Sequence, residues 1–385
     1  MERAYVPDTS PYATLAALAR SGARAALATV VAADGSTPQV PGASAVFTAR
    51  GLAGGTVGGG IGEARVEALA RRAIAAGVSR LTTLNLGYDP SAEGEAICGG
   101  RLRVLVDARP ERHVPVFLKM MEDVRRRKPG TLLTWIGAAR GARDSAAKGD
   151  LVVAERADVR RLWLPVGATG VLPWGPPFSR LREIPGAYRS ALRSIDGRAF
   201  SACCSALWAG APGLFEGRHG ALYVEPHAPA PRLIIAGAGH VGRAAAHLGH
   251  LLNFEVIVID DRPEFADADR FPEASRIVVA PASRALRRLP LGADAYVVIV
   301  TRGHRDDEGA LRACIRRRAA YVGMIGSARK VGLLRERFLQ KRWCSPAEWD
   351  RVRTPIGLPI GSRTVEEIAV SIAAELVAVR SARRT

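Results

Sequence analysis

The stretch from residue 232 to residue 262 constrains the fold of this chain more than any other. An apolar run at 233–236 predicts a buried strand, and the turn after it at 237–242, Gly-Ala-Gly-His-Val-Gly, fits the pattern G-x-G-x-x-G. Apolar residues then recur at helical spacing, and a second apolar run at 256–259 ends at Asp260 and Asp261. This order of strand, glycine turn, helix, strand and acid is typical of a dinucleotide-binding βαβ unit.

The residues of the turn have distinct predicted roles. Gly237 allows the tight turn, Gly239 lets a pyrophosphate approach the backbone, and Gly242 lets the helix pack closely on the strand. The helix begins near His240, where unpaired N–H groups and a partial positive charge favour phosphates. We therefore count these four residues as candidate cofactor contacts. The alternative is that the fold keeps its glycines for packing alone.

The acids that end the second strand predict which nucleotide fits. Asp260 is expected to accept hydrogen bonds from a ribose 2′-OH, with Asp261 beside it as a further contact. An acid there disfavours a 2′-phosphate, so NAD or another adenine nucleotide is favoured over NADP. Arg262 weakens this preference slightly.

Length and composition limit the class of protein. A chain of 385 residues, 48% hydrophobic and 24% charged, is long enough for two or three soluble domains. No apolar run reaches the ~18 residues of a membrane span, and the first residues show no signal pattern. The number of cysteines is odd and no C-x-x-C occurs, which favours reduced thiols. We expect a cytoplasmic protein without a membrane partner, and we expect Cys203 and Cys204 to be buried.

The formal charge of +18 comes from an excess of arginine. A GC-rich genome is one explanation, and an anionic small ligand or acidic partner is the other. Nucleic acid is not expected as a partner, because the basic residues are scattered and no aromatic residues are interleaved with them.

A second glycine-rich loop, at 54–62, leads into an alanine-rich helix that ends near residue 77. Gly58, Gly59 and Gly60 at a helix N-terminus predict an anion cradle, and Glu63 lies in the first turn. A close crossing of strand and helix explains the same glycines equally well. Further along, Cys98 precedes two glycines on a loop, where it is either a small buried residue or a thiol that meets a ligand.

Two loops at the predicted carboxyl ends of later strands are further candidates. His304, followed by Asp306 and Asp307, suits proton transfer or metal binding, although a capped turn before a helix at 307–318 is slightly favoured. Ser327 is a predicted N-cap, and Arg329 behind it predicts a second phosphate contact. No set of His, Asp and Glu residues has convincing metal-ligand spacing, so no metal site is predicted.

The order of predicted elements indicates two domains. Strands are expected at 25–33, 44–48, 81–86, 102–106, 131–136, 151–154, 162–165 and 221–224, with helices near 11–21, 115–126 and 186–194. Residues 138–150 are turn-prone, and the proline-rich stretch 225–231 is the clearest linker. We predict an N-terminal α/β domain with a mixed sheet at 1–228 and a C-terminal Rossmann-type, doubly wound parallel sheet at 229–385.

Taken in order, these motifs resemble the XdhC/CoxI family, the accessory factors of xanthine dehydrogenase and related molybdenum hydroxylases. The resemblance spans nearly the whole chain. It rests on these segments: 35–38 (Gly-Ser-Thr-Pro), 41–43, 55–60 with Glu63, 97–100 (Ile-Cys-Gly-Gly), 237–242, 260–262, 301–304, 323–327 with Arg329 and Lys330, and 356–361.

The resemblance implies a helper protein. Such proteins are thought to bind molybdenum cofactor as cargo, aid its sulfuration with a cysteine desulfurase, and insert it into the apo-hydroxylase. Some members carry a cysteine directly after the triple glycine, where this chain has Ile61. Any sulfur contact on the matching motifs would then fall to Cys98. A homodimer is an open alternative for the assembly.

Two other functions compete with this interpretation. One is an NAD-dependent oxidoreductase in which His304 acts as acid and base, although no recognisable hydride-transfer set accompanies the fold. The other is a nucleotide-sensing module in which the Rossmann domain regulates partner binding by the N-terminal domain.

Overall fold

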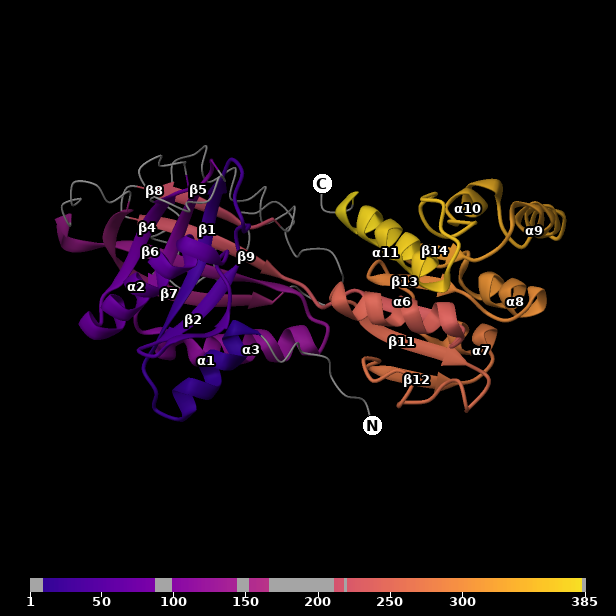
Figure 1. Cartoon of the computed structure of the whole chain (residues 1–385), viewed down its shortest axis with the longest axis horizontal. Helices are drawn as coiled ribbons and strands as arrows, with labels where there is room; N and C mark the ends of the chain where they lie inside the picture. The colour runs from indigo at the N-terminus through magenta and orange to yellow at the C-terminus, as the bar shows by residue number, and fades with distance from the viewer. Residues whose placement is uncertain (1–9, 87–98, 144–151, 166–210, 218–219, 383–385) are drawn as a thin grey trace. The chain divides into compact units, whose positions relative to one another are not determined.

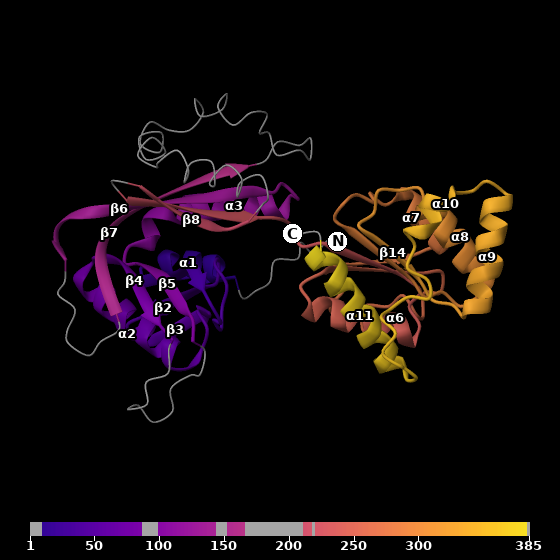
Figure 2. The same cartoon turned by 90° about the horizontal axis from the view of Figure 1, so that it is seen from above.

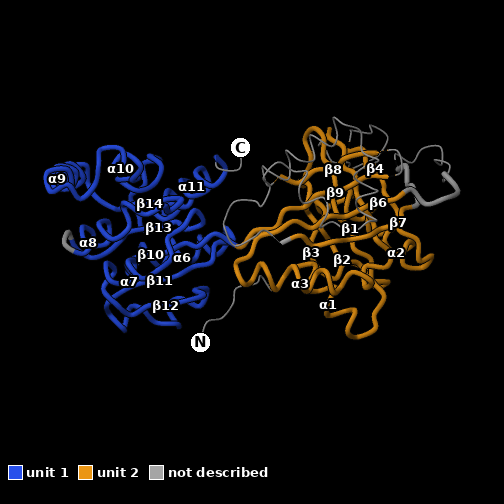
Figure 3. Tube along the Cα trace, turned by 180° about the vertical axis from the view of Figure 1, so that it is seen from behind, with its two compact units in different colours: residues 1–5, 230–385 blue, residues 6–229 orange. Residues whose placement is uncertain are grey.

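The computed structural model describes residues 10–86, 99–143, 152–165, 211–217 and 220–382. The chain forms two compact units that divide between Pro229 and Ala230, drawn in two colours in Figure 3. Each unit is described by itself below. No helix among the described residues is long and apolar enough to cross a membrane.

The N-terminal unit is built on one nine-stranded sheet (Figure 1). The strand order is β3-β2-β1-β5-β4-β7-β6-β9-β8, and the described pairs are all antiparallel. The elements are α1 (Pro11–Arg20), β1 (Ala25–Asp34), β2 (Ser44–Thr48), β3 (Gly51–Gly55), α2 (Gly60–Ala76), β4 (Ser79–Asn85), β5 (Arg101–Asp107), the 3₁₀ helix η1 (Pro110–His113), α3 (Val114–Arg125), β6 (Gly130–Arg143), β7 (Val152–Pro165), β8 (Gly213–Gly217) and β9 (Gly220–His227).

Alternation along the strands gives this sheet two packed faces. On β1, Ala26, Ala28 and Val30 belong to a buried cluster with α2, whereas Leu27 packs with α1 and α3 on the opposite face. Both faces are therefore covered near β1, which explains why β1 is buried over most of its length. The continuous apolar run that predicted this strand has the same cause.

The C-terminal unit is a five-stranded parallel sheet with order β12-β11-β10-β13-β14. This is a Rossmann arrangement, and the predicted α/β fold class is confirmed. The elements are β10 (Arg232–Ala236), α6 (His240–Leu251), β11 (Glu255–Asp260), β12 (Arg276–Val279), α7 (Ala282–Arg288), β13 (Ala295–Ile299), α8 (His304–Cys314), β14 (Tyr321–Met324), α9 (Ala328–Gln340), α10 (Pro346–Asp350) and α11 (Val365–Ala382).

Helices cover both faces of the parallel sheet. Helices α6 and α11 pack on the face that carries Leu233, Ile235 and Val298, and α7, α8, α9 and α10 pack on the other face. Figure 2 shows α6 and α11 side by side on one side of the strands. The strands are buried on both sides, as the continuous apolar runs predict.

Several predicted elements differ from the observed ones. The N-terminal sheet is antiparallel rather than mixed, because its described pairs include hairpins such as β2–β3 and β8–β9. Residues 138–143 continue β6, and the two short strands expected at 151–154 and 162–165 are one strand, β7. The polar residues of these two strands form backbone pairs between β6 and β7, although the composition of the segments is typical of turns.

The linker in the structure is shorter than the predicted linker at 225–231. Residues 225–227 pair with β6 as part of β9, so they belong to the sheet. Pro226 is tolerated there because β8 pairs only as far as Val224. The short strands β3 and β8 were not predicted. The expected helix at 186–194 and the pair Cys203 and Cys204 lie outside the described residues.

Candidate functional site

The carboxyl edge of the parallel sheet gathers the predicted Rossmann residues. From β10 the next strands, β11 and β12, are added on one side, whereas β13 and β14 are added on the other, so the direction of winding changes between β10 and β13. Open α/β sheets bind ligands at such a switch point, outside the carboxyl ends of the strands. The turn at 237–239 and the start of α6 at His240 lie at this point.

The three glycines of the turn meet different surroundings. At Gly237 φ is +119°, and a Cβ would lie 2.3 Å from the Val300 carbonyl oxygen. At Gly242 a Cβ would lie 1.9 Å from the Gly237 carbonyl oxygen. At Gly239 φ is −72° and a Cβ would meet nothing within 4 Å. Packing therefore explains Gly237 and Gly242, whereas Gly239 borders open space at the helix N-terminus.

Asp260 is held by the protein itself. Its Oδ2 accepts a hydrogen bond of 2.8 Å from the Ala238 backbone N–H, and its Oδ1 accepts one of 3.1 Å from the Arg262 backbone N–H. The Arg262 guanidinium donates to both oxygens, at 2.9 and 3.1 Å. Burial raises the pKa of Asp260, but these hydrogen bonds outweigh burial and lower it to about 2. The residue is only 6% exposed.

An open cleft lies beside this acid, and its space of about 310 Å³ includes open solvent. The ends of β10, β11 and β13 and the start of α7 form its walls. Its lining residues are Gly237, Ile259, Asp260, Asp261, Pro281, Ala282, Thr301, Arg302 and Asp306. The structure thus brings three predicted site residues, Gly237, Asp260 and Asp261, into one cleft.

Helix α8 begins earlier than the sequence indicated. It runs over His304–Cys314 with Gly303 as N-cap, so the helix expected at 307–318 is present but begins three residues earlier and ends four residues earlier. Asp307 is buried and accepts a hydrogen bond of 2.5 Å from Thr301 Oγ1, and it also pairs with Lys330 Nζ. Asp307 therefore ties the loop after β13 to α9. His304 is the first helical residue, and its side chain lies outside the described parts.

Ser327 is the N-cap of α9, as predicted. Its Oγ accepts a hydrogen bond of 3.3 Å from the Lys330 backbone N–H. Arg329 is exposed in the first turn, whereas the Lys330 side chain is paired with Asp307. Of the two cations behind the cap, the structure therefore leaves Arg329 directed toward solvent.

The glycine loop of the N-terminal unit holds a carboxylate of its own. Three successive residues, Gly58, Gly59 and Gly60, have φ of +132°, +69° and +56°. Glu63 Oε2 accepts hydrogen bonds from Thr56 Oγ1 at 2.6 Å, from the Val57 N–H at 2.9 Å and from the Gly59 N–H at 3.4 Å. Although partial burial raises the pKa of Glu63, these hydrogen bonds lower it overall. The loop thus holds the carboxylate of Glu63.

Three glycine-containing loops of this unit pack against one another. A Cβ at Gly58 would lie 2.9 Å from Pro38 Cγ, and a Cβ at Gly100 would lie 2.2 Å from the Ser36 carbonyl oxygen. A Cβ added at Gly35 would in turn lie 3.3 Å from the Gly100 Cα. The loop at 35–39 therefore lies between the triple glycine and the segment 99–100. Cys98 itself lies outside the described residues.

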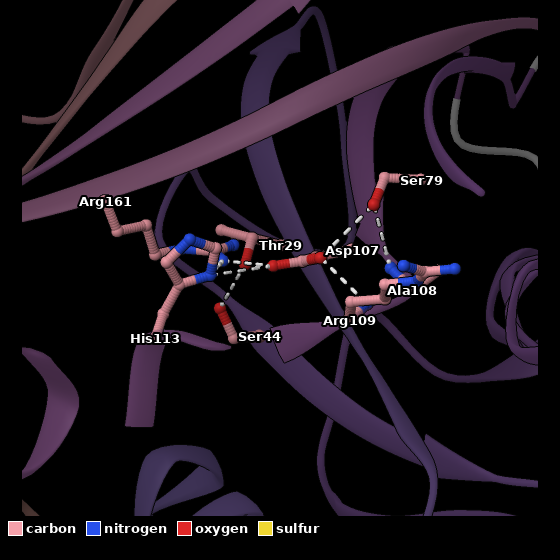
Figure 4. Close-up of polar contacts among 8 residues, drawn as sticks. All are labelled: Thr29, Ser44, Ser79, Asp107, Ala108, Arg109, His113 and Arg161. Atoms are coloured by element: carbon pink, nitrogen blue, oxygen red, sulfur yellow. Dashed lines mark hydrogen bonds and ion pairs between the residues drawn. The ribbon is translucent and has the colours of Figure 1, made fainter. Parts of the chain in front are cut away.

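The N-terminal unit also contains a buried ionic cluster that the sequence did not predict. Figure 4 shows Asp107 between Arg161 and His113 on one side and Ser79 with the backbone of 108–109 on the other. Asp107 pairs with Arg161, lies 3.5 Å from His113 Nδ1 and accepts a hydrogen bond of 3.2 Å from Ser79 Oγ. Burial raises the pKa of Asp107, but Arg161 and His113 outweigh it and hold the pKa well below its usual range.

The parts of the chain that the structure describes contain no cluster of three or more His, Cys, Asp and Glu residues that would hold a metal ion. Cys314 and Cys344 are buried and unpaired, and burial raises the pKa of both thiols. Neither has the lowered pKa of a reactive thiol.

Two models of one family match separate parts of the chain, which together make up more than half of its length. The model of the XdhC and CoxI family matches residues 18–85, and the model of the XdhC Rossmann domain matches residues 233–376. The chain belongs to the XdhC and CoxI family. The resemblance deduced from the motifs is therefore confirmed.

Two curated proteins match part of this chain. The uncharacterised protein YqeB of Escherichia coli K12 is 33% identical over 161 residues, which are 42% of this chain and 29% of YqeB. A Bacillus subtilis 168 protein, named as a probable xanthine dehydrogenase subunit, is 30% identical over 159 residues, 41% of this chain and 46% of that protein. The chain thus spans less than half the length of these curated relatives.

A solved structure extends the comparison to nearly the whole XdhC-type chain. A protein from Bacillus halodurans, described as a xanthine dehydrogenase, superposes with a TM-score of 0.69 over 97% of this chain and 96% of its own. The sequences are 21% identical. This likeness establishes the fold.

Proposed function

We propose that the protein is an accessory factor of a xanthine dehydrogenase-type molybdenum hydroxylase. It binds molybdenum cofactor as cargo, supports its sulfuration together with a cysteine desulfurase, and inserts it into the hydroxylase. Membership of the XdhC and CoxI family supports an accessory role, as does the relative whose name refers to xanthine dehydrogenase.

The observation that carries the proposal is the convergence of the glycine loops in the N-terminal unit. The triple glycine packs on the loop at 35–39, and that loop packs on Gly99 and Gly100. An added Cβ at Gly59, Gly60 or Gly99 would meet nothing within 4 Å, so a flat, rigid ring system can approach the backbone at these positions. A pterin is such a ring system.

The start of α2 supplies donors for the phosphate of the cargo. The first N–H groups of a helix have no partner within it, and an added Cβ at Gly59 or Gly60 would meet nothing within 4 Å. Glu63 takes the Val57 and Gly59 N–H groups, which leaves the first helical turn, Gly60 to Gly62, for an incoming anion. An anion fits this arrangement without a cationic side chain.

Sulfur chemistry is assigned to Cys98 in this proposal. The residue after the triple glycine is Ile61, which is 39% exposed and supplies no thiol. Cys98 directly precedes Gly99 in the sequence, and Gly100 packs on the loop at 35–39. A thiolate is both a nucleophile and a metal ligand, as cofactor sulfuration requires.

The test is retention of molybdenum cofactor. The full chain is mixed anaerobically with the cofactor and desalted, and the retained pterin and phosphate are measured by absorbance and phosphate assay. We expect near-stoichiometric retention by the unmodified protein and a loss of at least about tenfold in Cys98→Ala. Cys344→Ala, which removes a buried thiol in the other unit, is the control and should retain the cofactor.

The outcomes separate the competing functions. A folded protein that retains no pterin contradicts the proposal, and equal retention by Cys98→Ala removes the role of that thiol. A nucleotide-sensing module is the second candidate, because the cleft at the Rossmann sheet is present independently of the N-terminal loops. That module would bind nucleotide and no pterin.

A further inference from the structure

The last helix of the chain, α11, carries almost no charge along its middle. From residue 368 to residue 379 the sequence reads Ile-Ala-Val-Ser-Ile-Ala-Ala-Glu-Leu-Val-Ala-Val, and Glu375 is the one charged residue in this stretch. Glu375 is buried, and its Oε2 accepts hydrogen bonds from Tyr321 Oη at 2.5 Å and from the Gly357 N–H at 2.9 Å. The stretch therefore places no charge on the outer side of the helix.

The inner side of α11 explains only half of this apolar composition. Helix α11 lies beside α6 (Figure 2), and Ile372 and Leu376 are buried in a cluster that includes Ala245 and Phe254. The opposite side of such a helix normally carries polar residues, and a helix that is apolar all round is normally buried all round. The composition therefore indicates that a further surface covers the outer side of α11.

The outer side of α11 is an apolar stripe, which we define as Val370, Ala373, Ala374 and Val377. Val370 is 49% exposed, and the other three side chains are partly exposed. The members are three or four residues apart, so they lie on one face of the helix. This spacing is also that of a seam between two packed helices.

The loop before α11 adds two exposed apolar side chains near the start of the helix. Leu358 is 36% exposed and Ile360 is 54% exposed. The Leu358 N–H donates to the Ser371 carbonyl oxygen at 3.2 Å, and Ser371 Oγ donates to the Leu358 carbonyl oxygen at 2.8 Å. Because these bonds already fix the loop on α11, a partner pays little ordering entropy to pack there.

The outer stripe is complementary to itself. If a second copy of α11 lies antiparallel to the first, with a two-fold axis between Ala373 and Ala374, each Val370 faces Val377 of the other copy. Each Ala373 then faces Ala374 of the other copy, next to the axis. Such small side chains allow two helix axes to approach to the lower end of the usual ~8–10 Å. A two-fold interface requires this self-complementarity of one patch.

The charges at the two ends of α11 fit the same arrangement. The first turn carries Glu366 and Glu367, and the last turn carries Arg380, which also donates to the Leu252 carbonyl oxygen. In an antiparallel pair the acidic end of each helix meets the basic end of the other. A parallel pair would instead bring like charges together, so the charges favour the antiparallel order.

We propose that α11 forms the interface of a homodimer, in which its outer stripe packs antiparallel against the outer stripe of a second copy of this chain. A helix of 18 residues is about 27 Å long, so one of its faces supplies less than the ~800 Å² per partner of a standard interface. The dimer is therefore weak, and its population depends on protein concentration.

The experiment measures the mass of the full chain by sedimentation velocity over a range of concentrations. We expect a shift from the mass of one chain to that of two, with a dissociation constant of about 10–100 μM. Val370→Glu should weaken association at least about tenfold, because it buries a carboxylate at two symmetric places. Leu333→Glu makes a similar change at an exposed position of α9, on the other face of the sheet, and should leave association unchanged.

A charge exchange tests the antiparallel register. Val377→Lys alone should also weaken association, whereas the variant with both Val370→Glu and Val377→Lys should regain most of the lost affinity. In that variant each new carboxylate faces a new ammonium group of the other copy. Within one chain the two positions are two helical turns apart, about 10 Å along the axis, so the new charges do not pair with each other.

Three results would overturn the proposal. A full chain that stays monomeric up to ~300 μM would assign the outer stripe to a different protein. The second contrary result is association that Val370→Glu leaves unchanged, and the third is a double variant without recovery. Melting temperatures confirm that each variant is folded, and Val370→Glu should not lower them because the side chain is exposed. Cofactor retention is a separate measurement, so this proposal and the proposed function fail independently.

Discussion

A single buried carboxylate, Asp107, ties three parts of the N-terminal unit together. It ends β5, and it pairs with Arg161 of β7 while lying near His113 of η1. Both partners of the ion pair have side chains that are 2% exposed. Removal of one partner of such a pair leaves the other charge buried and uncompensated, which costs far more than the pair itself contributes.

We therefore expect Asp107→Asn to lower the free energy of unfolding by about 3–5 kcal/mol. The double variant Asp107→Asn with Arg161→Met should lose less than the single variant, because no charge is then stranded. Urea unfolding of the full chain measures both values. A loss under about 1 kcal/mol in Asp107→Asn would mean that water reaches this cluster.

The acid that holds the Rossmann glycine turn gives a pH prediction. The pKa of Asp260 is about 2 in the folded protein, below the ~3.9 of an unfolded chain. Its contribution to stability is therefore present above about pH 4 and is lost as the pH falls from about 4 to 2. The unfolding free energies of the unmodified protein and Asp260→Asn should converge over that range. Parallel curves would contradict this assignment.

At the scale of elements, the approach of α6 to β10 depends on Gly242. A Cβ there would lie 1.9 Å from the Gly237 carbonyl oxygen, which is backbone and cannot move aside cheaply. The helix would have to shift away from the strand. Gly239 is the matched position, because an added methyl group meets nothing and its φ of −72° suits alanine.

We expect Gly242→Ala to destabilise the protein by about 1–3 kcal/mol, the usual cost of overpacking. Gly239→Ala should leave the melting temperature almost unchanged and should weaken NAD binding, because the methyl group enters the space that the sequence predicts for a pyrophosphate. Thermal unfolding and calorimetry on both variants measure these effects. Similar destabilisation by both changes would show that the helix start packs more tightly than described.

At the scale of the whole molecule, each unit has its own apolar cores. The clusters of the C-terminal unit draw their residues from β10 onward, and those of the N-terminal unit end at β9. The chain divides between Pro229 and Ala230 by its contacts. Independent cores are the physical requirement for independent folding.

We expect the segment 229–385 to fold alone and to bind NAD with the affinity of the full chain. Circular dichroism, a cooperative thermal transition and calorimetry measure this. A control that starts at residue 244, inside α6, removes β10 and should not fold, because β10 is the central strand of the sheet. An unfolded 229–385 segment would contradict the proposed domain boundary.

Local sequence patterns predicted helices and strands well where neighbouring residues alone decide the structure, as in apolar runs and helix caps. The apolar runs before residues 237 and 260 became β10 and β11, and the cap at Ser327 is as predicted. A capping box between Ser345 and Glu348, which also depends on neighbouring residues alone, opens α10. The predictions failed where pairing to distant strands decided the outcome, as for the polar residues of β6 and β7.

The sequence by itself determined the Rossmann unit, the glycine turns and the family, because these depend on neighbouring residues and on backbone freedom at glycine. Only the tertiary structure decided which of the two acids is exposed. Asp260 and Asp261 are chemically identical, but successive side chains at a strand end point to different surroundings, and Arg262 holds the first while the second faces solvent. Asp107 and Arg161 are 54 residues apart in the sequence, and they meet only because β5 and β7 lie in the same folded sheet.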